Sequence, residues 1–187
     1  MTSRRRRRRA FYPPAEFSEL AVVQARWREL RDEAVSALTI VGLRVGMDTS
    51  QTYILPLVAE AQDRDLIPDE VCAEARALSP LAMSLTSEVP YAIGCAFSRL
   101  TPGKHITPHY HATPYLTAIL CLDDGGGGSH ILVDGQRRDF VNGELTIFDY
   151  TLEHESRNEG TRDRIVMLLL IDPRRVRSTR ASTPPTR

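Results

Sequence analysis

The chain has 187 residues, which is enough for one well-packed domain and too few for two comfortable ones. Hydrophobic residues make up 42% and charged residues 26%, as in ordinary globular proteins. No apolar run approaches the roughly 18 residues that a membrane-spanning helix needs. The composition therefore predicts one soluble domain and excludes a transmembrane helix.

Arginine is concentrated at the two ends of the chain. Six arginines stand together at Arg4 to Arg9, and five more lie within residues 174–187. Without these, roughly 13 basic residues face 24 acidic ones, so the body of the chain is acidic. An acidic body opposes the docking of an arginine run on nucleic acid or on an anionic membrane, so we do not expect either partner.

The same terminal composition sets the expected domain limits. We predict a disordered arm at residues 1–12, a single folded domain at residues 13–173, and a disordered tail at residues 174–187. No apolar segment follows the arginine run, so we do not expect it to act as a secretion signal. The three cysteines, Cys72, Cys95 and Cys121, have no paired spacing, which favours buried reduced thiols in a cytoplasmic protein.

Helical signals come first along the chain. Between residues 16 and 38, apolar side chains recur close to the helical period, with charges on the opposite face. These apolar positions are Phe17, Leu20, Val23, Trp27, Leu30, Ala34 and Leu38. A second, shorter helix is expected at residues 68–78, because Pro68, Asp69 and Glu70 suit a helical first turn.

Short strand signals separated by turn residues follow from residue 90 onward. The expected strands cover residues 95–100, 105–109, 115–122, 130–134, 138–141, 144–149 and 165–171. Asp134-Gly135 and Asn142-Gly143 predict tight turns, and Gly125 to Gly128 predict a flexible connection. Helices followed by strands predict a mainly β protein of α+β type, in which helices pack on one sheet of a small barrel at residues 90–172.

Histidines form the most informative cluster. Residues two apart on a strand point to the same face, so His109 and His111 would present their imidazoles side by side. His154 is placed where a later strand of a barrel could supply a third ligand. Imidazoles suit an intermediate metal such as Fe(II), and three ligands on one face leave positions open for oxygen and substrate. The alternative is that these strand histidines face water or bond to backbone carbonyls.

Residues 94–172 carry a spaced motif that resembles the aspartyl/asparaginyl β-hydroxylase family. The matching residues are Ser98, Pro102, Gly103, Pro108 and His109, then Gly143, Glu144, Phe148, Asp149, His154 and Glu155, then Arg164. The same segment also resembles the cupin pattern through Gly103, His109-Tyr110-His111, His154 and Asn158, although the usual cupin glutamate is absent. Both resemblances imply a double-stranded β-helix, a jelly-roll barrel.

The hydroxylase resemblance also implies roles for individual residues. His109 and His154 would bind Fe(II), while Arg164 and Ser98 would grip the distal carboxylate of 2-oxoglutarate. His111 stands where the family has Gly, or Asp in related oxygenases, and would complete a three-histidine site. Thr117 and Ile119 occupy positions where the family places an Arg and a His for the cosubstrate. The expected chemistry needs no catalytic side chain beyond the metal centre.

Three functions are therefore open from the sequence. The first is a 2-oxoglutarate-dependent hydroxylase that acts with O2 on an amino acid, a peptide residue or a related small metabolite. The second is a three-histidine iron oxygenase that binds its substrate directly at the metal, without 2-oxoglutarate. The third is a non-catalytic, cupin-like barrel that only binds a ligand. Of the remaining histidines, we expect a second-site or surface role for His105 and a solvated position at the surface for His130.

Overall fold

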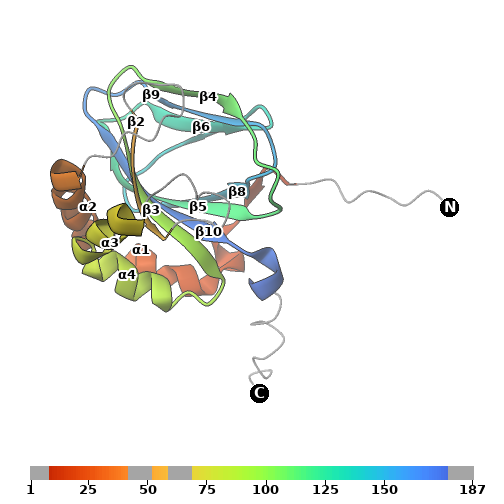
Figure 1. The fold of residues 1–187 in the computed structure, drawn as a ribbon. Coiled ribbons are helices and arrows are strands. Elements are labelled where there is room, and N and C mark those ends of the chain that lie inside the picture. Colours follow the sequence, from red (N-terminus) through yellow and green to blue (C-terminus); the bar gives the residue numbers. More distant parts are fainter. Residues whose placement is uncertain (1–8, 42–51, 59–68, 177–187) are drawn as a thin grey trace.

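The computed structural model describes residues 9–41, 52–58 and 69–176, which form two facing β-sheets with helices packed on one of them (Figure 1). The larger sheet has the strand order β1-β8-β5-β10-β3-β2, and the smaller sheet has the order β4-β9-β6-β7. All paired strands are antiparallel, and strands far apart in sequence are neighbours. The protein is a mainly β, two-sheet jelly roll with N-terminal helices, as the sequence predicted.

The ten strands described by the structure have the following bounds. The six-stranded sheet contains β1 (Phe11–Tyr12), β8 (Leu145–Asp149), β5 (Leu116–Asp124), β10 (Arg164–Ile171), β3 (Ala92–Leu100) and β2 (Thr52–Val58). The four-stranded sheet contains β4 (His105–His109), β9 (His154–Asn158), β6 (Ser129–Val133) and β7 (Gln136–Asp139).

The helical layer is divided more finely than the sequence predicted. Its elements are the 3-10 helices η1 (Pro14–Glu16) and η2 (Ser18–Leu20), followed by α1 (Ala21–Ala25), α2 (Trp27–Val41), α3 (Asp69–Ala77) and α4 (Pro80–Ser87). The single helix expected at residues 16–38 is interrupted because Phe17 and Arg26 adopt non-helical backbone angles. In the described part of the chain, no helix has the length and apolar character of a membrane span.

Alternation along β10 explains how one strand serves two cores. Met167 and Leu169 point to the helical layer and join its hydrophobic cluster, whereas Val166 joins the cluster between the sheets. Because successive strand residues point to opposite faces, Arg164 lies on the same inner face as Val166. In a strand that is buried on both faces, nearly every side chain is apolar. This is why the apolar run at residues 165–171 predicted a strand.

The folded domain extends further toward both ends of the chain than predicted. Phe11 and Tyr12 pair with Phe148 and Ile147, so the last residues of the expected arm form an edge strand. Val176 is buried in the helical core, so the expected tail begins too early. Residues 1–8 and 177–187, the rest of the predicted arm and tail, lie outside the described residues.

The close approach of Gly143 to Trp27 fixes the helical layer against the sheet. Gly143 has φ +81°, and a Cβ atom there would lie 2.7 Å from Trp27 Nε1. Gln24 Nε2 also donates a hydrogen bond of 2.9 Å to the Gly143 carbonyl oxygen. The turn before β8 therefore needs glycine for its backbone conformation and for the space that the indole occupies.

We predict that Gly143→Ala lowers the free energy of unfolding by about 2–5 kcal/mol, from left-handed backbone strain and from overpacking against Trp27. Gly135→Ala is the matched control, because Gly135 has φ +72° and nothing lies within 4 Å of its added Cβ. The free energy of unfolding of the control should fall by only about 1–2 kcal/mol. Urea unfolding of both variants measures the difference, and equal losses would show that the indole contact is unimportant.

Candidate metal centre

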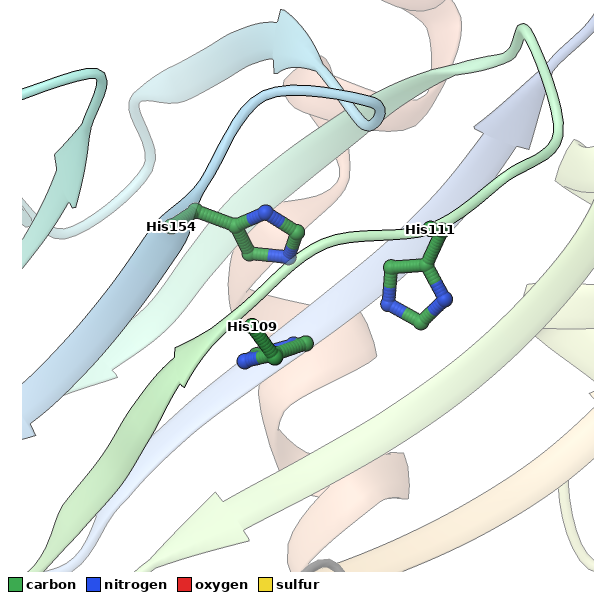
Figure 2. Close-up of side chains that lie close together, drawn as sticks. All are labelled: His109, His111 and His154. Carbon is green, nitrogen blue, oxygen red and sulfur yellow. The ribbon is translucent and has the colours of Figure 1, made fainter.

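Three histidines from two segments of the chain gather at one point between the sheets. The possible ligand nitrogens of His109, His111 and His154 all lie within 4.8 Å of one another. The ring centroids of His109 and His154 are 4.2 Å apart, and that of His111 lies 5.3 Å and 5.6 Å from them. Figure 2 shows the three rings turned toward a common space. The structure thus brings together all three of the predicted ligands.

Strand pairing places the first two histidines. His109 ends β4 and His154 begins β9, and the two residues are direct partners in the antiparallel ladder. Directly opposed residues point to the same face of a sheet, so both imidazoles enter the space between the sheets.

His111 reaches the cluster by a different route from the one predicted. It lies beyond the end of β4, so strand alternation with His109 does not position it. Instead, its backbone N–H donates a hydrogen bond of 3.2 Å to the Tyr150 carbonyl oxygen. Its ring also stacks on Tyr150 with centroids 3.6 Å apart and planes 7° from parallel. The loop and the aromatic ring together hold the third imidazole.

Backbone carbonyls fix the tautomers of two histidines. Nδ1 of His109 lies 2.8 Å from the Thr107 carbonyl oxygen, and Nδ1 of His154 lies 2.8 Å from that of Leu152. A carbonyl oxygen only accepts hydrogen bonds, so Nδ1 carries the proton in each ring. Nε2 then keeps its lone pair, which is the arrangement usually found in metal-binding histidines.

Burial keeps the imidazoles in the form that binds metal. It lowers the pKa of His154 to about 4, and the nearby His109 adds to this effect against the opposing Leu152 carbonyl. Burial likewise lowers the pKa of His111 to about 4, assisted by His154 and His109. Both rings are therefore neutral at pH 7, so protons compete little with a metal ion for these ligands.

Arg164 is a buried cation without a carboxylate partner among the described residues. Its side chain is 2% exposed, and its NH1 group donates a hydrogen bond of 2.7 Å to Ser156 Oγ. Its Nε has no hydrogen-bond partner among the described residues, and its guanidinium lies 5.2 Å from the Phe140 ring centroid. Burial lowers its pKa to about 10, so it stays charged at neutral pH. A buried, uncompensated guanidinium is well suited to bind an anion.

The other predicted cosubstrate positions share the inner face with Arg164. Ser98 is buried and pairs with Val166, two residues from Arg164 on β10. Thr117 and Ile119 are buried on the inner face of β5. Thr117 contributes a neutral hydroxyl group there, and Ile119 contributes an aliphatic side chain. This part of the inner face therefore carries no second cation.

The sequence did not predict the contacts made by two inward-facing residues of β9, Ser156 and Asn158. Ser156 accepts the hydrogen bond from Arg164 and donates one of 3.0 Å to the His130 carbonyl oxygen. Asn158 is fully buried; its amide group donates to the Leu100 and Arg162 carbonyl oxygens and its side-chain oxygen accepts from Ser129 and Gly160. Asn158 thus braces the barrel. The alternating polar positions in His-Glu-Ser-Arg-Asn were the available signal for this strand.

The remaining histidines lie away from the metal cluster. His105 Nε2 lies 2.6 Å from Glu155 Oε2, on β9. His130, which was expected at the surface, is instead only 3% exposed, and its Nδ1 donates to the Gly128 carbonyl oxygen at 3.1 Å. The sequence expectation failed because His130 lies inside the sheet, between β9 and β7, and not at the tip of the glycine-rich turn.

We predict that His109→Ala and His154→Ala each weaken Co(II) binding by at least about 100-fold. Mutation of a residue that only orients a metal ligand already weakens metal binding about 10- to 100-fold, and removal of the ligand itself should weaken it more. The matched control is His105→Ala, because His105 also lies on β4 but bonds to Glu155. The visible absorption of bound Co(II) measures affinity. Unchanged affinity in either ligand variant would exclude this cluster as the metal site.

Comparisons with known proteins identify the family of this chain. No curated protein matches the sequence. A cupin domain of an XRE-family transcriptional regulator from Enterobacter cloacae is 17% identical with a TM-score of 0.38, covering 43% of this chain and 81% of that one. The cupin domain of Cnp3 from Schizosaccharomyces pombe is 9% identical with a TM-score of 0.44, covering 74% and 77%.

A third similar structure is a salicylate 1,2-dioxygenase variant from Pseudoaminobacter salicylatoxidans. It is 13% identical with a TM-score of 0.37, covering 49% of this chain and 24% of that one. The model of the aspartyl/asparaginyl beta-hydroxylase family matches residues 24–174, a span that includes all three clustered histidines and Arg164. The chain therefore belongs to the aspartyl/asparaginyl β-hydroxylase family.

Proposed function

We propose that this protein is a non-haem Fe(II), 2-oxoglutarate-dependent oxygenase that hydroxylates an amino acid, a peptide residue or a related small metabolite. The observation that carries the proposal is the position of Arg164. Its guanidinium bonds to Ser156, which lies two residues from His154 on the same face of β9. Two residues span about 7 Å along a strand, so a buried cation lies close to the histidine cluster.

The donor set fits iron. His109, His154 and His111 would supply three neutral imidazole nitrogens, a set that suits intermediate metals such as Fe(II). When bound, Fe(II) supplies activation of O2 for insertion of oxygen into a C–H bond. The protein holds the imidazoles in a fixed tautomer through Thr107 and Leu152, so the ligands need little reorganisation.

Arg164 would hold the distal carboxylate of 2-oxoglutarate. A guanidinium pairs with a carboxylate through two parallel hydrogen bonds, and the unpaired Nε of Arg164 leaves such a face available. Ser156 keeps the NH1 side of the fork in place. On the inner face of β3, Gly94, Ala96 and Ser98 are small, whereas Leu100 is the direct partner of Arg164.

Apolar side chains near the cluster would keep water away from the reaction. The Phe148 ring lies 5.0 Å from the His154 ring, and it belongs to the buried cluster between the sheets with Ile119, Val133 and Val166. Excluding water strengthens the electrostatic attraction of Arg164 for an anion and protects reactive species from side reactions.

A second candidate is a three-histidine iron oxygenase that binds its substrate directly at the metal without 2-oxoglutarate. The presence of His111 in the cluster favours it, because a third neutral ligand leaves the bound metal more positive than a carboxylate would. An anionic substrate could then compensate the charge of the metal and of Arg164 by itself.

We predict that Arg164→Met raises the dissociation constant for 2-oxoglutarate about 100-fold, since a carboxylate loses its charged partner. The same change should leave stability unchanged or increased, because it removes an uncompensated buried charge. Arg162→Met is the control, because the Arg162 side chain is 63% exposed and pairs with Asp123. Anaerobic calorimetry with Mn(II)-loaded protein measures binding. Equal affinity in wild type and Arg164→Met would remove Arg164 from the cosubstrate site.

Anaerobic Fe(II) titration of the wild type and His111→Ala, with and without 2-oxoglutarate, separates the candidates. We expect a visible charge-transfer band in the wild type only when 2-oxoglutarate is present, and weaker Fe(II) binding in His111→Ala. Succinate should then accompany product formation in air. Turnover without 2-oxoglutarate would favour the second candidate, and no affinity for Fe(II), Co(II) or Mn(II) would leave only a ligand-binding barrel.

A further inference from the structure

Thr117 carries a buried hydroxyl group for which the fold supplies no partner. The residue is 5% exposed, and its Oγ1 has no hydrogen-bond partner among the described residues. Buried polar groups in native proteins are nearly always paired, so an unpaired one calls for an explanation. Valine has almost the same shape and would fill the position without this cost.

The hydroxyl lies on the face of the sheet that meets the histidine cluster. Thr117 on β5 is the direct partner of Phe148 on β8. The Phe148 ring lies 5.0 Å from the His154 ring, so Phe148 points into the space between the sheets. Because direct partners point to the same side, the Thr117 side chain enters that space beside Phe148.

Arg164 approaches the same space from the other end of β10. Thr117 pairs with Leu170 near the end of β10, whereas Arg164 is the first residue of that strand. A neutral donor thus lies near the histidines and a cation lies toward the opposite end of the inner face. A molecule with oxygen-bearing groups at both ends would satisfy both orphan groups.

We propose that the Thr117 hydroxyl binds the ligand of the histidine centre by donating a hydrogen bond to a carboxylate oxygen of the bound 2-oxo acid. The inference rests on the proposed function, and it adds a recognition group at the metal end of the pocket. A hydroxyl acts here as a neutral donor, so the site gains a contact to an anion without a second buried cation.

Thr117→Val gives this proposal two readouts that change in opposite directions. The melting temperature of the metal-free protein should rise by about 2–4 °C, because an unpaired buried hydroxyl is removed. The dissociation constant of 2-oxoglutarate for Mn(II)-loaded protein, measured anaerobically by calorimetry, should increase about 10- to 100-fold. Thr117→Ser keeps the hydroxyl and should restore affinity.

Ser79→Ala is the matched control for removal of an unpaired hydroxyl elsewhere. Ser79 is fully buried at the start of α4, and its Oγ also lacks a partner among the described residues. This variant should bind 2-oxoglutarate as tightly as the wild type. If Thr117→Val binds equally tightly as well, the proposal is overturned while the proposed function stands. If the metal-loaded wild type binds no 2-oxoglutarate, the proposed function fails and this inference fails with it.

Discussion

The antiparallel pairing of β4 with β9 is the constraint on which the rest of the site depends. It makes His109 and His154 direct partners although 45 positions separate their numbers in the chain. The next inward residue of β9 is Ser156, which holds Arg164, and the one after it is Asn158, which braces the barrel. A shift of the β4–β9 register by one residue would turn the inward side chains of one of these two strands to the other face and separate the histidines.

The interior combines groups that a stable core would avoid. Among the described residues, Arg164 is buried without a carboxylate partner, and Thr117 keeps an unpaired hydroxyl. Two of the clustered imidazoles have their pKa values lowered to about 4 by burial. Such departures from good packing chemistry are expected where a protein binds a ligand. The imidazoles, Arg164 and Thr117 lie on the inner faces of the sheets, apart from the hydrophobic cluster under the helices.

The sequence predicted much of the architecture because apolar alternation and turn residues mark most of the strands. It missed β9, since His-Glu-Ser-Arg-Asn contains no apolar residue, and it missed β2, where Pro56 is tolerated because the strand lies at a sheet edge. The motif identified His109, His154 and Arg164 by spacing. It could not show the stacking of His111 on Tyr150 or the bond from Arg164 to Ser156, since these contacts depend on how the two sheets meet.

The short strand β1 has a practical consequence for how the chain is handled. Phe11 and Tyr12 cover the outer edge of β8, the strand that carries Phe148 toward the histidines. A shortened chain that starts at residue 13 would leave the backbone amides and carbonyls of β8 bare. Bare strand edges recruit other strands and promote aggregation. Trimming the arginine-rich start of the protein should therefore stop before Ala10, whose carbonyl oxygen accepts a hydrogen bond from the Asp149 amide.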